Sequence, residues 1–227
     1  GQVYATMWGI AFAGAPIAQV LLSQIVKQVL QTMDWRAAML YLSGVVFVAL
    51  IIAGLLARKN PGDYGAKPFG LKEGDTRAAA RNLRDWTLKE AFSTFAIWGA
   101  IIAFLTSMLA EFLIWSQIVS YWIINAGYDS ATATNLYIVI GIAGIFTMPI
   151  MGIVADRLVS RTGDEIKARK LMLVFAPTMG VVACLFLFAS ARSMVMAVIA
   201  CILFAIYWAI EPGGVAGYAG AVYGSKS

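Results

Sequence analysis

Two glutamates lie within long apolar stretches of this 227-residue chain, which is 61% hydrophobic and 13% charged. Glu111 has Ser107 and Trp115 one helical turn away on either side. Glu211 has Tyr207 one turn before it, and residues at this spacing share a helix face. A carboxylate inside a membrane is costly and usually faces a cavity or a polar partner. The candidate substrate-binding or coupling residues are therefore Glu111, Trp115, Tyr207 and Glu211.

The position of Glu211 allows two interpretations. It directly precedes Pro212 and a pair of glycines, in a segment, 192–226, that is too long for one straight crossing. We therefore expect the helix to break at Pro212, and broken helices beside an ionisable group are typical of transport sites. Alternatively, Glu211 lies at the inner membrane interface and is simply hydrated.

Composition argues against several other functions. The chain has no histidine, which excludes histidine general bases and histidine metal sites. Cys184 and Cys201 lie in apolar runs and are expected to be core residues without a disulfide. The net charge of +5 comes from basic residues in short loops between apolar runs, which is membrane topology rather than a nucleic-acid surface. No catalytic cluster, arginine ladder or filter loop is visible, so the sequence predicts no enzyme, no cofactor and no metal site.

A charged segment, 152–170, separates two membrane-length apolar stretches and must lie at a water interface. Its three acidic and five basic residues are Asp156, Asp164, Glu165, Arg157, Arg161, Lys167, Arg169 and Lys170. The pattern in which Gly152 is followed by Asp156-Arg157 and then by Arg161 resembles a loop signature of the major facilitator superfamily, Gly-x-x-x-Asp-Arg-x-Gly-Arg-Arg. The match is partial, because valine and serine stand at two of the family's later positions.

The resemblance implies a gating role for Asp156, Arg157 and Arg161. In the family, the loop aspartate of one bundle approaches the cytoplasmic start of a helix in the other, which here begins near Gly1–Tyr4. The two arginines would hold the loop by pairing with nearby acids or carbonyls. The alternative is that Asp156 only pairs with a neighbouring arginine in water, which stabilises little.

Six apolar spans predict an all-α, polytopic membrane protein. They cover roughly 3–26, 36–57, 92–122, 131–155, 171–190 and 194–222, and each can cross about 30 Å of hydrocarbon as a helix. The pattern Thr87 to Glu90 is a capping box, so we expect the third span to begin near Leu88. Asp129 or Ser130 is expected to cap the fourth span.

The first span carries a row of small residues. Ala5, Gly9 and Ala13 recur at intervals of four, which predicts that another helix approaches closely.

The basic residues assign an orientation. Fourteen of the 17 lie at 58–90, 156–170 and Lys226, and the other three lie in the alternate loops or beside them. The first group is therefore expected to be cytoplasmic, in a multi-pass protein of the cell (inner or plasma) membrane.

The resemblance also implies an architecture of twelve helices in two six-helix bundles joined by a long cytoplasmic loop. The order of spans here is similar to helices five to ten. On that basis 1–57 holds the last two helices of the first bundle, 58–90 is the loop, and 91–227 holds the first four helices of the second. The chain would be an internal piece, and the missing helices of the same polypeptide would be its partners together with the lipid bilayer.

The implied function is secondary active transport of a small solute by alternating access, as antiport or proton-coupled symport. The turn at 60–65 is similar to one in monocarboxylate and oxalate/formate-type carriers, which favours a small organic carboxylate. Such carriers often have an arginine in the eighth helix, but the matching span here has no basic residue before Arg157. An alternative is a proton-coupled carrier that uses Glu111 or Glu211 as the proton site. A six-span channel or an integral membrane enzyme is the competing class.

Overall fold

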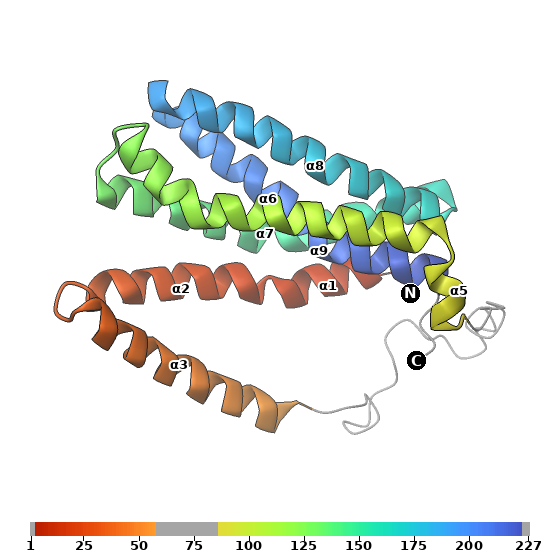
Figure 1. The fold of residues 1–227 in the computed structure, drawn as a ribbon, viewed down its shortest axis with the longest axis horizontal. Helices are drawn as coiled ribbons and strands as arrows, with labels where there is room; N and C mark the ends of the chain where they lie inside the picture. Colours follow the sequence, from red (N-terminus) through yellow and green to blue (C-terminus); the bar gives the residue numbers. More distant parts are fainter. Residues whose placement is uncertain (1–2, 58–85, 224–227) are drawn as a thin grey trace. The chain divides into compact units, whose positions relative to one another are not determined.

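The structure, a computed structural model, describes residues 3–57 and 86–223, and these residues form helices without a strand. The helices, in the labels of Figure 1, are α1 (Tyr4–Phe12), α2 (Gly14–Val29), α3 (Trp35–Leu56), α5 (Leu88–Phe92), α6 (Phe95–Ile124), α7 (Ser130–Thr162), α8 (Glu165–Ala189), the 3-10 turn η2 (Ser190–Arg192) and α9 (Met194–Tyr223). Within the described ranges, six helical segments are long and apolar enough to cross a membrane, with α1 and α2 together forming the first. The predicted all-α fold with six spans is confirmed.

The chain divides into two compact units, a smaller one of residues 18–81 with residue 1, and a larger one of residues 2–17 and 82–227. In the smaller unit, Asp34 caps α3 by accepting a hydrogen bond from the Ala37 amide at 2.8 Å. The predicted loop at 58–90 lies outside the described residues as far as residue 85.

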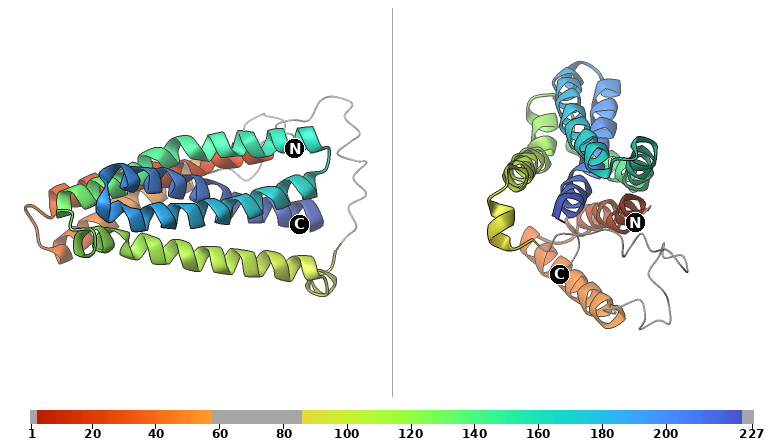
Figure 2. Two further views of the ribbon diagram at one scale, coloured as in Figure 1. Left: turned by 90° about the horizontal axis from the view of Figure 1, so that it is seen from above. Right: turned by 90° about the vertical axis from the view of Figure 1, so that its right-hand side faces the viewer.

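In the larger unit, α9 is the helix around which the others pack. It contacts α8, α7, α6 and α1, and these helices lie side by side (Figures 1 and 2). Its buried positions include many small residues, which allow neighbouring backbones to come close. Residues of α9 in the main core include Ala197, Cys201, Phe204, Ala205 and Ile210.

The capping box at Thr87 and Glu90 is confirmed, but it starts a different helix from the one expected. It caps the five-residue α5, and the membrane span α6 begins only at Phe95. The hydroxyls of Ser93 and Thr94 donate to the carbonyls of the preceding turn, which offers the backbone an alternative to helix continuation. The break between α5 and α6 therefore coincides with side-chain hydrogen bonds, which cannot be predicted from the pattern of apolar residues.

The charged segment 152–170 is almost entirely helical. Its charges and its place between two apolar stretches predicted a short hydrophilic hairpin, and that prediction is corrected here. Helix α7 has 33 residues and is about 50 Å long, well beyond the hydrocarbon thickness. The turn to α8 consists only of Gly163, at φ +67°, and Asp164, whose side chain accepts from the Lys167 amide at 3.0 Å. A left-handed glycine followed at once by an N-cap makes so short a turn possible.

Helix α9 continues through Pro212, so the expected break is wrong. The neighbouring helices hold it together, as tertiary packing often does for a helix with a local weakness. The start of α7 agrees with the sequence, because Asp129 caps it through the Thr132 amide at 3.0 Å. The hydrogen bond that the Thr132 hydroxyl donates lowers the pKa of Asp129.

Candidate functional site

Glu111 projects from α6 into the interior of the larger unit and is 5% exposed. Trp115, one turn later, donates its indole N–H to Glu111 Oε1 at 3.3 Å. The second oxygen, Oε2, is buried and has no hydrogen-bond partner among the described residues. Glu111 is therefore only partly compensated by its surroundings.

Glu211 projects from α9 and is 2% exposed. The structure therefore does not support the alternative in which this carboxylate is simply hydrated at the membrane interface. Neither of its oxygens makes a hydrogen bond of good geometry within the described residues, although the Ser107 side chain of α6 is close by. Glu111 is near enough to interact with it electrostatically. The two carboxyl groups thus belong to one environment between α6 and α9.

Tyr207 connects the same two helices. Its hydroxyl donates to the Ser107 backbone oxygen at 2.9 Å, so the tyrosine of α9 is anchored to α6 one turn before Glu111. The structure thereby brings together all four residues predicted as substrate-binding or coupling candidates. We refer to Ser107, Glu111, Trp115, Tyr207 and Glu211 as the carboxyl cluster.

The Trp115 ring fixes one side of this cluster. It packs edge-on against Tyr137, Phe204 and Trp208, with centroid separations of 5.2, 5.4 and 5.0 Å. Such aromatic contacts restrict the rotamer of Trp115 and hence the direction of its N–H. Within residues 3–57 and 86–223, no basic side chain forms an ion pair with Glu111 or Glu211.

Asp156, on the cytoplasmic part of α7 by the predicted orientation, contacts the first turn of α1. It is 8% exposed, and its Oδ1 accepts from the Ala5 amide at 3.1 Å. Its Oδ2 accepts from the Thr6 amide at 2.8 Å and from the Thr6 hydroxyl at 2.7 Å. These are unpaired amides of a helix start, where a carboxylate is favoured by hydrogen bonding and by the helix dipole. The expected approach of Asp156 to the first span is present.

The contact is possible because α1 and α7 cross with their backbones in close contact. A Cβ on Gly152 would lie 2.4 Å from the Ala5 carbonyl oxygen, and one on Gly9 would lie 2.3 Å from that of Met148. Neither position accommodates a side chain without separating the helices. The predicted row of small residues on the first span is thus used for close packing.

Arg157 and Arg161 do not form the ion pairs expected of them. Both are exposed, and among the described residues neither is bridged to an acid. Asp164 is used as the N-cap of α8, and Glu165 binds Arg169 instead. Asp164 and Glu165 therefore bind partners about one turn away in α8. The spacing of charges along the segment does not by itself show which partner each acid binds.

Arg169, which the sequence reasoning did not single out, is buried at 4% exposure. Its Nε and Nη2 donate to Glu165 Oε1 at 3.1 and 2.9 Å. Its guanidinium carbon lies 5.2 Å from the centroid of the Tyr4 ring, at the start of α1. The i, i+4 spacing of Glu165 and Arg169 was the available signal, but it does not predict burial.

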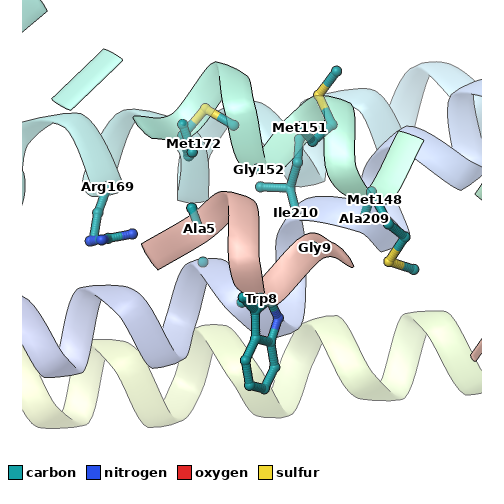
Figure 3. Close-up of a pocket in the computed structure, with 13 residues that line it drawn as sticks. Ala5, Trp8, Gly9, Met148, Met151, Gly152, Arg169, Met172, Ala209 and Ile210 are labelled. Carbon is teal, nitrogen blue, oxygen red and sulfur yellow. The ribbon is translucent and has the colours of Figure 1, made fainter. Parts of the chain in front are cut away.

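A cavity of about 30 Å³ lies among α1, α7, α8 and α9. Figure 3 shows Arg169 at one end of it, beside the first turn of α1. Its lining includes Ala5, Trp8, Gly9, Gly152, Arg169 and Met172. It is large enough to hold water, and no residue of the carboxyl cluster lines it. The cluster is therefore closed off from this space in the conformation described.

Residues 3–226 match the family model of the Major Facilitator Superfamily. Neither a curated protein nor a solved structure shows a significant match to the chain.

Proposed function

The chain belongs to the major facilitator superfamily, a family of membrane transporters, and we propose that it moves a small organic carboxylate across the cell membrane by alternating access. Transport of a solute across a membrane follows from the family and from the six spanning helices. The substrate class is supported by the likeness of the turn at 60–65 to carboxylate carriers. We further propose that the chain corresponds to helices five to ten and functions with the remaining helices of the same polypeptide.

In this proposal 1–57 and 91–227 belong to two bundles joined by the loop 58–90, and the contact between Asp156 and α1 is an inner gate. It joins helices that alternate access must separate, which is the observation that carries the mechanism. A carboxylate on a helix start gains about 0.3–1 kcal/mol, and more when it is partly buried. Because the contact exists only when the inner side is closed, it favours the outward-facing state.

The test of the gate is Asp156→Asn in the full-length protein. We expect faster labelling, from the cytoplasmic side, of a single cysteine placed at Met172 in the cavity lining, because the gate loses a charge and one acceptor. Asp164→Asn is the matched control, because it also neutralises an acid at this end of α7. Asp164 caps α8 by accepting from the Lys167 amide, and asparagine is an equally good N-cap. Equal labelling in the two variants and the parent would leave Asp156 with no gating role.

For coupling, we propose that the carboxyl cluster takes up the proton in a proton-coupled symport. Three of its four carboxyl oxygens are buried without a hydrogen-bond partner in the described chain, and no cation pairs with them. A buried anion without compensation is expensive, so a proton is a natural occupant. Antiport of two carboxylates is the second candidate, because the resemblance to monocarboxylate and oxalate/formate-type carriers leaves the mode of coupling open.

Glu111→Gln and Glu211→Gln, each in full-length protein in proteoliposomes, distinguish the two. With symport, a pH gradient drives uptake of oxalate, formate or lactate in the parent, and each variant loses that dependence while retaining exchange. With antiport, uptake needs internal carboxylate and ignores the gradient. If the parent transports none of these carboxylates under either condition, the substrate class is wrong.

A further inference from the structure

Arg169 is the one basic side chain that is buried within the described residues. Its guanidinium meets a single carboxylate oxygen, Glu165 Oε1, through Nε and Nη2. Arginine is the side chain best suited to bind carboxylates, since its planar fork presents paired donors. A buried arginine that spends two donors on one oxygen retains further donors for a second anion.

The guanidinium occupies a slot that three helices form. One face lies over the Tyr4 ring of α1. On the α9 side it passes so close to Gly217 that a Cβ there would lie 2.7 Å from Nη1. Glycine at 217 thus leaves room for the guanidinium beside α9, while α1 covers its other side.

The helix that covers the guanidinium, α1, is also the helix that moves away when the proposed gate opens. Residues Ala5, Trp8 and Gly9 of α1 form a wall of the cavity that Arg169 also lines. When α1 moves away at this end, the Tyr4 ring leaves with it, and the guanidinium becomes a wall of an open inner cavity. Arg169 belongs to α8, where Glu165 binds it, and Gly217 of α9 lies beside it, so its position does not depend on α1.

We propose that Arg169 binds the carboxylate of the substrate on the cytoplasmic side of the carrier when α1 has moved away. In the closed state the guanidinium contacts the Tyr4 ring and Glu165. In the open state the substrate carboxylate takes the place of the Tyr4 ring. This supplies a cationic contact that α7 lacks, because no basic residue precedes Arg157 in that helix. The proposal rests on carboxylate transport as the function.

The experiment measures exchange in right-side-out and inside-out vesicles with full-length protein, so that the KM on each face is obtained separately. Arg169→Gln is expected to raise the cytoplasmic KM for oxalate about tenfold or more, the loss of one charge-assisted hydrogen bond, and to change the external KM little. Arg169→Lys keeps the charge but lacks the planar guanidinium fork. Its cytoplasmic KM is expected to lie between those of the parent and Arg169→Gln. Lys170→Gln, an exposed cation on the next residue, is the matched control and should leave both constants unchanged.

The outcomes separate the two proposals. If Arg169→Gln changes both KM values equally, or neither, while the parent transports oxalate, Arg169 does not bind substrate and the carboxylate function stands. If the parent transports no carboxylate, the underlying function fails. Should Arg169→Gln not fold, Arg169→Lys still decides, since an unchanged cytoplasmic KM in that variant contradicts recognition by the guanidinium fork.

Discussion

Asp156 does for α1 what an N-cap side chain ordinarily does from within the same helix. The residue at the N-cap of α1, Val3, makes no side-chain cap hydrogen bond. The amides of Ala5 and Thr6 are satisfied instead by a carboxylate about 150 residues further along the chain. A cap provided by a separate helix stabilises only the arrangement in which both helices meet, which is the property a gate needs.

This cap predicts a change in stability. Asp156→Ala should lower the free energy of unfolding by about 0.5–2 kcal/mol, because the amides of Ala5 and Thr6 lose their acceptor. Thermal unfolding in detergent measures the effect. Adding Val3→Asp to Asp156→Ala gives α1 its own cap and should restore stability without restoring the gate. Recovery of both would show that the interhelix contact itself has no role in closure.

At the scale of elements, the approach of α1 to α7 depends on glycine rather than on hydrophobic area. Gly9 and Gly152 each face a backbone carbonyl of the other helix at a distance that excludes a Cβ. The surrounding small and apolar side chains, including Ala13 and Met148, then pack into a second core cluster with Trp208. The close crossing of α1 and α7 thus places Asp156 within hydrogen-bonding distance of the first turn of α1.

Gly152→Ala should therefore reproduce the Asp156→Asn phenotype without changing any charge. The added methyl must push α1 away from α7, which lengthens the hydrogen bonds from Ala5 and Thr6 to Asp156. Cytoplasmic labelling of a cysteine at Met172 is expected to accelerate. Gly99→Ala in α6, where a Cβ would meet no atom within 4 Å, is the matched control. Similar labelling in both variants would mean that the crossing accommodates the added methyl without opening.

At the scale of the whole molecule, the charge pattern makes a prediction about topology. Several contacts of the larger unit gather at one end: Asp156 with α1, Arg169 with Gly217, and Trp86 with Tyr223, whose rings lie 5.3 Å apart. The turn at 125–129 joins α6 and α7 at their other ends. Among the described residues, Lys89 and the five basic residues of 156–170 lie at the first end, so that end is expected to be cytoplasmic.

Cysteine labelling tests the orientation. In a background without Cys184 and Cys201, Ser160→Cys should react with an impermeant reagent only in inside-out vesicles, and Ala126→Cys only in sealed cells. Ser160 is exposed, and Ala126, in the turn between α6 and α7, is half-buried. Reversed or equal reactivity would contradict the assignment.

The sequence alone determined the features that depend on local chemistry. Six spans follow from apolar runs of membrane length, and the caps at Thr87 and Asp129 follow from side chains that reach amides three residues away. The four candidate residues of the carboxyl cluster followed from the cost of a charge in a membrane. The approach of Asp156 to α1 followed from the resemblance to the family, since no local pattern connects residues so far apart.

Only the tertiary structure decided what depends on neighbours. Pro212 would break an isolated helix, but α9 is supported by four other helices and continues through it. Arg169 carries the same charge as Arg157 and Arg161, yet it alone is buried, because Gly217 and Tyr4 leave a slot at its position. Glu111 and Glu211 come together because α6 and α9 are adjacent, which no spacing within either helix could reveal. Charge and hydropathy set which residues cannot face lipid, and the packing of the helices sets which of them meet.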